Sequence, residues 1–352
     1  MARALQLARH GLFTTAPNPR VGCVIAHGGN RVGEGWHERA GAPHAEVNAL
    51  TVAGAAARGA TVYVSLEPCT HHGRTAPCAD ALVAAGVARV VAAMQDPNPL
   101  VAGKGLARLE EAGVAAECGL LEDEARELNI GFVSRMKRGR PWVRMKLAAS
   151  LDGKTALNNG RSRWITGAAA RRDGHAWRAR ACAVLTGIGT VKDDDPQLTV
   201  REVETTRQPL RVIVDSRLET PVAARILQGG GVLIAAAVND SGNFPALKAT
   251  GAELVVLPDA GGKVELEALM RELARRGINE VHVEAGHKLN GSLFGEGLVD
   301  ELVIYLAPHL IGDAARGMFN LPELEDLCGR HELKVHDLRM VGRDIRVIAR
   351  FV

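Results

Sequence analysis

Two short segments hold side chains that could bind a metal ion. The run GAPHAEVNAL contains His44 and Glu46, and the run LEPCTHHGRTAPC contains Cys69 and Cys78, each cysteine following a proline. One imidazole and two thiolates are ligands that zinc prefers, and they leave the fourth tetrahedral position open for water. Zinc would lower the pKa of that water toward neutrality. Glu46 could then take its proton and deliver it to a reacting group.

The order of these residues is close to a known pattern, H-x-E followed by P-C-x-x-C, which is typical of zinc nucleobase deaminases. The first half and the first Pro-Cys pair fit, but eight residues instead of two separate Cys69 from Cys78. Positions i and i+2 of a helix lie on different faces, so the spacing alone does not make His44 and Glu46 converge.

Two interpretations without catalysis stay open. A structural zinc site would need a fourth ligand, which His71 or His72 could supply. Alternatively, the histidine caps a helix and the two thiols are unrelated. Of the other cysteines, Cys23, Cys118 and Cys182 lie in or beside apolar runs and are predicted to be small buried side chains.

Strand and helix patterns alternate around these segments. Strands are predicted at 21–27, 31–37, 61–66 and 88–94, and helices at 4–13, 44–57, 76–85, 103–113 and 122–132. Such an order favours a partly parallel sheet flanked by helices. The basic run RMKRGRP at 135–141 interrupts the rhythm and is predicted to be a linker. We therefore expect one domain at 1–140 and another at 141–352.

The second half repeats this alternation. Strands are predicted at 142–153, 180–187, 209–216, 230–238, 252–257, 279–286 and 300–308, and helices at 166–180 and 263–276. The last two extended runs, 331–341 and 344–352, are predicted to form an antiparallel hairpin on a mainly parallel sheet. The expected fold class is α/β, with two domains.

Composition excludes several classes of protein. The 352 residues are 47% hydrophobic and 24% charged, which is enough for two independent cores. The net charge of +3 is too small to argue for nucleic acid or an anionic membrane. No run approaches the roughly 18 apolar residues of a membrane span, and the first residues lack a secretory signal. We expect a cytoplasmic protein with reduced cysteines.

A dinucleotide-binding fingerprint, G-x-G-x-x-G, is absent from the second half, where the nearest run at 187–192 (GIGTVK) lacks the third glycine. Two places, 187–195 and 283–293 (VEAGHKLNGSL), nevertheless combine a strand, a glycine and the start of a helix. Backbone N–H groups there could bind phosphate. Both places could equally be ordinary turns.

Several whole segments resemble one family. TAPNPRVGCVI, GAPHAEVNAL, SLEPCTHHGRTAPC, MQDPNPLVAGKG, KLAASLDGKTAL and VEAGHKLNGSL resemble the bifunctional deaminase/reductases of riboflavin biosynthesis, from near the first residue to the closing hairpin. The longer cysteine spacing is what that family shows. The resemblance implies a cytidine-deaminase-like zinc domain at 1–140 and a dihydrofolate-reductase-like domain at 141–352.

For the first domain, the resemblance implies hydrolytic deamination of 2,5-diamino-6-(5-phosphoribosylamino)pyrimidin-4-one. One zinc ion per chain would be bound by His44, Cys69 and Cys78, and Glu46 would be the proton shuttle.

Three further residues would face the pyrimidine or its phosphate, namely Asn18, His71 and Arg74. From the residues alone, Asn18 could also cap its turn, and Arg74 could also be a solvated charge.

For the second domain, the resemblance implies NADPH-dependent reduction of the ribosyl chain of 5-amino-6-(5-phosphoribosylamino)uracil to ribityl. Cofactor contacts would come from Ala148, Trp164, Thr190, Asp194, Ser216, Gly286, His287, Lys288, Leu289, Asn290, Gly291 and Ser292. Substrate contacts would come from Ser162, Arg178, Leu198, Arg201 and Glu284. Two guanidinium groups, those of Arg178 and Arg201, could clamp one phosphate or be solvated charges. Lys146 lies in an apolar strand and would orient or protonate the sugar.

Two other functions are compatible with a zinc site in the first domain. A nucleic-acid deaminase with an accessory domain would need a basic surface and stacking aromatic residues, yet aromatic residues are only 3%. A zinc-stabilised binding protein would have no activity at all. For the favoured function we expect small phosphorylated pyrimidines as partners, no nucleic acid or membrane, and a homo-oligomer, either a dimer or a tetramer.

Overall fold

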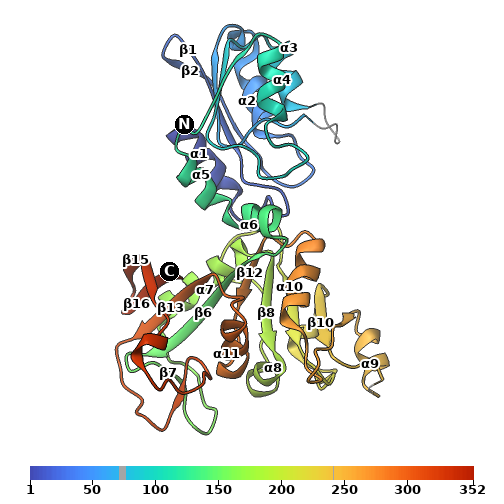
Figure 1. Cartoon of the computed structure of the whole chain (residues 1–352), viewed down its shortest axis with the longest axis vertical. Coiled ribbons are helices and arrows are strands. Elements are labelled where there is room, and N and C mark those ends of the chain that lie inside the picture. Colours follow the sequence, from blue (N-terminus) through green and yellow to red (C-terminus); the bar gives the residue numbers. More distant parts are fainter. Residues whose placement is uncertain (71–76, 241) are drawn as a thin grey trace. The chain divides into compact units, whose positions relative to one another are not determined.

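The computed structural model describes residues 1–70, 77–240 and 242–352, so His71 and Arg74 lie outside the described residues. The chain folds into two compact units, Met1–Arg140 and Pro141–Val352 (Figure 1). They are called the N-terminal and the C-terminal unit below.

The N-terminal unit alternates strands and helices much as its sequence pattern predicts. Its elements are α1 (Ala2–Ala8), β1 (Gly22–His27), β2 (Asn30–Trp36), α2 (Ala45–Ala53), β3 (Thr61–Val64), α3 (Cys78–Ala84), β4 (Arg89–Ala92), α4 (Lys104–Glu111), β5 (Ala115–Cys118), α5 (Glu122–Leu128) and α6 (Ile130–Arg138). The strands form one sheet in the order β2-β1-β3-β4-β5. Strand β1 is antiparallel to β2 and β3, whereas β3, β4 and β5 are parallel.

Helices cover both faces of this sheet (Figure 1). Cys23 and Ile25 point to the core that α2, α3 and α4 complete, while Val24 between them packs against α1. Helix α2 lies very close to β2, because a Cβ atom at Gly35 would be only 2.5 Å from the carbonyl oxygen of Ala45. The glycine therefore lets the beginning of α2, next to His44, sit directly on the sheet.

The C-terminal unit is larger. Its elements are β6 (Trp142–Ser150), β7 (Lys154–Ala156), α7 (Ala168–Arg180), β8 (Ala183–Gly187), α8 (Ile188–Asp194), β9 (Leu210–Val214), β10 (Val232–Ala236), α9 (Phe244–Ala249), β11 (Glu253–Val256), α10 (Leu266–Arg275), β12 (Glu280–Val283), α11 (His287–Gly295), β13 (Glu301–Ala307), β14 (Arg316–Gly317), β15 (Leu333–Val341) and β16 (Asp344–Phe351).

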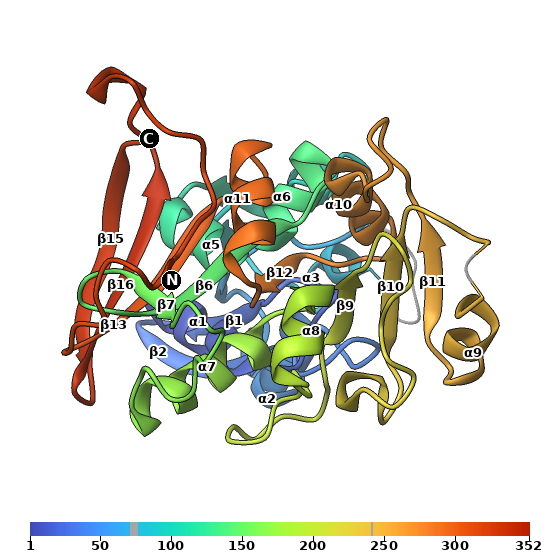
Figure 2. The same cartoon turned by 90° about the horizontal axis from the view of Figure 1, so that it is seen from below.

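Its main sheet runs in the order β11-β10-β9-β8-β12-β6-β13-β16-β15. The strands from β11 to β13 are parallel, and the hairpin β15–β16 adds to β13 in the antiparallel sense, which confirms the predicted hairpin. Helices α10 and α11 cover one face, and α7 and α8 cover the other (Figure 2). The strands are fully apolar where both faces are covered, as in β10.

Three details differ from the sequence predictions. Residues 135–141 are mostly not a linker, because α6 continues through Arg138 and ends where Gly139 adopts φ +66°. The predicted helix at 122–132 is two helices, α5 and α6, separated at Asn129. Cys118 is exposed at the end of the edge strand β5, whereas Cys23 and Cys182 are buried as predicted. An edge strand exposes residues that hydrophobicity alone places inside.

Among the residues that the structure describes, no helix combines the length and the apolar character needed to cross a membrane.

Candidate functional site

Three side chains of the N-terminal unit form a cluster suited to a metal ion. Candidate ligand atoms of His44, Cys69 and Cys78 all lie within 4.8 Å of one another. The Nδ1 atom of His44 is 3.2 Å from Sγ of Cys78 and 3.6 Å from Sγ of Cys69. A tetrahedral zinc ion with bonds of about 2.0–2.3 Å separates its ligand atoms by about 3.5–3.8 Å. The cluster therefore fits zinc both in its atom types and in its spacing.

Local structure fixes each of these ligands. His44 is the residue before α2, and its extended backbone (φ −74°, ψ 164°) turns the chain into the helix. Cys78 is the first residue of α3 and follows Pro77, the N-cap residue of that helix. Its backbone N–H lies 3.5 Å from Sγ of Cys69, so the two cysteine segments are joined even before a metal binds.

A buried carboxylate, Glu67, anchors the loop that carries Cys69. Its two oxygens accept backbone N–H groups from Asp96, Gly103, Gly105 and Leu106 at 2.8–3.3 Å. A carboxylate with four such donors is strongly held. Backbone groups of residues 96–106 therefore hold the loop of Cys69 in place through Glu67.

Glu46 lies in the first turn of α2 and is only 3% exposed. Burial, together with the negative charge of Cys69, raises the pKa of Glu46 to about 7. Hydrogen bonds from Cys78 and His44 lower the pKa of Cys69 to about 4. A carboxyl group that exchanges its proton near neutral pH, beside a thiol (Cys69) that readily becomes a thiolate, is suited to proton transfer.

Asn18 is oriented by a histidine that sequence reasoning missed. The ring of His37 donates through Nδ1 to the carbonyl oxygen of Pro43 (3.1 Å), so its Nε2 accepts from the amide Nδ2 of Asn18, also at 3.1 Å. The ring of His37 also lies edge-on to that of His44, with centroids 5.3 Å apart. One of the two N–H groups of Asn18 is used in this bond, and the amide plane is fixed with its oxygen available as an acceptor. A single histidine after a strand carries no motif that would reveal this role.

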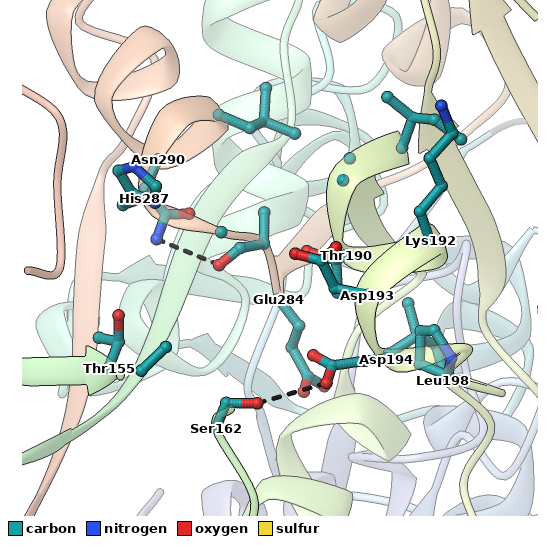
Figure 3. A pocket seen from close by; sticks show the side chains of 18 of the residues that line it. Thr155, Ser162, Thr190, Lys192, Asp193, Asp194, Leu198, Glu284, His287 and Asn290 are labelled. Carbon is teal, nitrogen blue, oxygen red and sulfur yellow. Dashed lines mark hydrogen bonds between the residues drawn. The ribbon is translucent and has the colours of Figure 1, made fainter. Parts of the chain in front are cut away.

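The C-terminal unit contains a cavity of about 1400 Å³ at the carboxyl ends of its parallel strands (Figure 3), where α/β sheets usually bind ligands. The residues implied by the resemblance that line it are Lys146, Ala148, Ser162, Trp164, Arg178, Thr190, Asp194, Leu198, Arg201, Ser216, Glu284, Gly286, His287, Lys288, Leu289 and Asn290. Side chains from six or more separate segments thus meet at one place.

Two implied cofactor residues, Gly291 and Ser292, lie inside α11 and do not line the cavity. The hydroxyl of Ser292 donates to the carbonyl oxygen of Lys288 at 3.3 Å. A Cβ atom at Gly291 would lie 2.1 Å from the carbonyl oxygen of Asn320, so this glycine serves packing. The cavity is also lined by Lys192, at the end of the run GIGTVK, and by cations and a histidine that no motif marked, namely Arg171, His175, Arg217, Lys263 and Arg316.

Charged groups in the middle of β6, on α7 and directly after β12 form a compact network. Glu284 is paired with Arg178 through two of its guanidinium nitrogens, and Nζ of Lys146 lies 4.0 Å from the same carboxylate. Burial lowers the pKa of Lys146. The charge of Arg178 is the main influence that holds the pKa of Glu284 far below its usual range against the opposing effect of burial. Glu284 is therefore an anion throughout the physiological pH range.

Several features fit a phosphate-bearing dinucleotide. The hydroxyl of Ser162 donates to Asp194 at 3.3 Å (Figure 3), which ties the loop after β7 to α8. A Cβ atom at Gly189 would meet nothing within 4 Å, so the beginning of α8 is open to a ligand. The Oδ1 atom of Asn290 is buried, and the described residues give it no hydrogen-bond donor. A ligand in the cavity could supply one.

The fold and these two sites define a protein with a zinc-binding deaminase domain followed by a reductase domain. Residues 1–94 match the cytidine and deoxycytidylate deaminase zinc-binding region, and residues 141–347 match the RibD C-terminal domain. The chain belongs to the RibD family of bifunctional deaminase/reductases of riboflavin biosynthesis. The predicted fold class, with zinc in the first domain and NADPH in the second, is confirmed.

Curated relatives cover almost the whole chain. Riboflavin biosynthesis protein RibD of Escherichia coli is 51% identical, over 98% of this chain and 96% of the relative. The protein of the same name from Haemophilus influenzae is 47% identical, over 99% and 95% respectively.

Solved structures agree in fold over the full length. RibD of Acinetobacter baumannii superposes with a TM-score of 0.92 at 44% identity, covering 100% of this chain and 97% of that chain. A diaminohydroxyphosphoribosylaminopyrimidine deaminase/5-amino-6-(5-phosphoribosylamino)uracil reductase from Thermotoga maritima superposes with a TM-score of 0.89 at 33% identity, with the same coverage.

Proposed function

We propose that the N-terminal unit deaminates 2,5-diamino-6-(5-phosphoribosylamino)pyrimidin-4-one by hydrolysis. The C-terminal unit then reduces the ribosyl chain of 5-amino-6-(5-phosphoribosylamino)uracil to ribityl. The observation that carries this proposal is the convergence of His44, Cys69 and Cys78 beside the buried Glu46. A zinc-stabilised binding protein would have no need to bury an additional carboxyl group at that point.

In the deaminase reaction, zinc supplies a water molecule that is acidic near neutral pH. Glu46 takes one proton of that water and gives it to the ring nitrogen as the oxygen adds to the carbon. It then takes the second proton from the added oxygen and gives it to the amino group, so that the C–N bond breaks and ammonia leaves. The pKa of about 7 lets Glu46 both accept and return a proton. Asn18 orients the pyrimidine through its amide group, whose plane the bond to His37 fixes.

In the reductase reaction, NADPH held by the cavity residues of α8 and α11 would be the source of the hydride. Arg201 binds the substrate phosphate, and Glu284 and Lys146 contact the ribosyl hydroxyl groups. Lys146, on β6, has its Nζ atom 4.0 Å from Glu284. Burial lowers the pKa of Lys146, which makes its ammonium group a better proton donor to the opening sugar ring. These assignments rest on the cavity lining and on the resemblance.

The protein is further proposed to be a homo-oligomer that associates through the hairpin β15–β16. Leu333, Val335, Leu338 and Met340 share one face of β15 and are 41–65% exposed. A row of apolar residues on an edge strand is costly unless it is covered, and a second copy of the same strand covers it by symmetry. Replacing Leu338 and Met340 by lysine should lower the mass measured by sedimentation.

We further propose that the protein is cytoplasmic, because Cys69 and Cys78 must stay reduced to bind the metal and the cytoplasm is a reducing compartment.

One experiment tests both activities in the intact chain. The purified protein is given the diaminopyrimidine substrate and NADPH, and ammonia release and NADPH oxidation are followed together. We expect ammonia without NADPH, and NADPH oxidation only after ammonia has formed. Oxidation without ammonia, or neither, would contradict the proposed order.

A further inference from the structure

One face of α7 lines the cavity of the C-terminal unit. Arg171, Gly174, His175 and Arg178 all contribute to the lining. Their spacing of i, i+3, i+4 and i+7 places them on a single helix face. The guanidinium of Arg171 lies over the ring of Trp164, 4.6 Å from its centroid, so this residue is already engaged with a side chain of the protein.

The hydrogen bonds of His175 determine where its ring carries a proton. The backbone N–H of Arg201 donates to Nδ1 of His175 at 3.2 Å. Because Nδ1 acts as the acceptor, a neutral ring must carry its hydrogen on Nε2. Burial, and then the positive charges of Arg178 and Arg201, lower the pKa of His175, so the neutral ring is the form present at pH 7.

The proton on Nε2 has no acceptor among the described residues. The only hydrogen bond that the structure gives this ring is the one at Nδ1. The Nε2 atom is not among the unpartnered atoms that are closed off from solvent. Although the residue as a whole is only 6% exposed, its free nitrogen must therefore open onto the cavity that the ring lines.

The neighbouring glycine leaves room at the same point. Gly174 lies in the middle of α7, where glycine costs about 1 kcal/mol relative to alanine. No packing explains this cost, because a Cβ atom there would meet nothing within 4 Å. Since Gly174 has no side chain, a ligand in the cavity can approach the helix backbone beside His175 closely.

We propose that His175 is a further substrate-binding residue of the reductase, and that its Nε2–H donates to the phosphate group that Arg201 binds. The proposal rests on the proposed function of the C-terminal unit and adds a residue to it. Arg201 is exposed, and its backbone N–H is bonded to the ring of His175. The two side chains therefore start close together, and one anion can reach both. Arg178 contributes less, since Glu284 and the carbonyl oxygen of Thr199 occupy three of its nitrogens.

Two substitutions separate the outward donor from the bond to Arg201. In His175→Asn, the side-chain oxygen takes the place of Nδ1 and accepts the N–H of Arg201, but nothing replaces Nε2. In His175→Gln, the amide nitrogen reaches the place of Nε2. We expect His175→Asn to raise the KM for the phosphorylated substrate by about tenfold to a hundredfold, as for one lost hydrogen bond to a charged group. His175→Gln should recover part of that loss.

The readout that a merely structural role would not produce is dependence on the phosphate. The same kinetics are measured with the dephosphorylated aminouracil riboside, for which kcat/KM of His175→Asn should equal that of the unaltered chain. The KM for NADPH should not change. As a matched control, His309→Asn, which alters a histidine outside the cavity lining, should leave both KM values unchanged.

The inference is overturned if His175→Asn leaves the KM for the phosphorylated substrate unchanged. It is also overturned if this substitution lowers kcat/KM for the dephosphorylated riboside by the same factor. Failure of the proposed function looks different, because the unaltered chain would then not reduce the phosphorylated substrate at all.

Discussion

The guanidinium group of Arg178 and the carboxylate of Glu284 form a two-point ion pair. Nη2 lies 2.9 Å from Oε2, and Nε donates to Oε1, while both side chains are only 14% exposed. Paired N–H···O bonds fix the plane of the carboxylate. The pair therefore holds Glu284 toward the cavity, and it leaves Arg201 as the guanidinium with more donors available for a phosphate.

Removing the side chain of Arg201 should weaken binding of the phosphorylated substrate more than binding of NADPH. Arg201→Ala is expected to raise the substrate KM by about tenfold to a hundredfold, because one charge-assisted contact is lost. Arg178→Lys should mainly lower kcat, since lysine cannot hold the plane of Glu284. Steady-state kinetics with each ligand varied in turn distinguish these effects. A rise in the NADPH KM with Arg201→Ala would place this residue in the cofactor site.

Replacing Glu46 should abolish deamination without loss of metal. Glu46→Gln keeps the shape of the side chain but cannot move a proton, which costs roughly 10²–10⁴-fold in rate. Ammonia release measures the loss, and metal analysis should still find about one zinc per chain. NADPH-dependent reduction of the deaminated substrate serves as the internal control. Normal ammonia release would rule out the proton-shuttle role.

Zinc content should depend on two of the cysteines. Cys69→Ser and Cys78→Ser should each lower bound zinc strongly, because a three-ligand site tolerates the loss of a thiolate poorly. Cys23→Ser and Cys118→Ser are matched controls, one buried and one exposed, and should retain zinc. Equal zinc in all four variants would contradict the site.

Stability of the C-terminal unit should decrease in mild acid because of His282. This ring is fully buried, which lowers its pKa to about 3. The unfolded chain takes up the proton near pH 6.5 and the folded chain does not, so stability is complete above about pH 6.5. Below that pH it falls by about 1.4 kcal/mol per pH unit.

His282→Leu should remove this contribution. Between pH 7 and pH 5, the loss in unfolding free energy should be smaller than in the unaltered chain by about 2 kcal/mol. Urea unfolding followed by tryptophan fluorescence measures the difference. An identical pH slope in both proteins would show that His282 is not the group that titrates.

The alternation of elements was readable from the sequence because it depends on local hydrophobic period and on strand-ending glycines. The hairpin of β15 and β16 and the mainly parallel sheet were predicted for this reason. The exposure of Cys118 was missed, because whether a strand lies at a sheet edge depends on pairing partners far away in sequence. The continuation of α6 through the basic residues 135–138 was also missed. Basic side chains are favourable in the last turn of a helix, where they interact with the negative end of its dipole.

For the deaminase site, the sequence by itself determined the ligand types, since histidine, cysteine and glutamate are few and their order is specific. Only the tertiary structure brought Cys69 within reach of His44, through the four backbone bonds to Glu67, and oriented Asn18 by His37. In the reductase cavity, the residues come from many strands and loops, and their types are common. Chemistry carried by rare residues can be read along the chain, whereas a site built from common residues exists only once folding has brought the ends of the strands together.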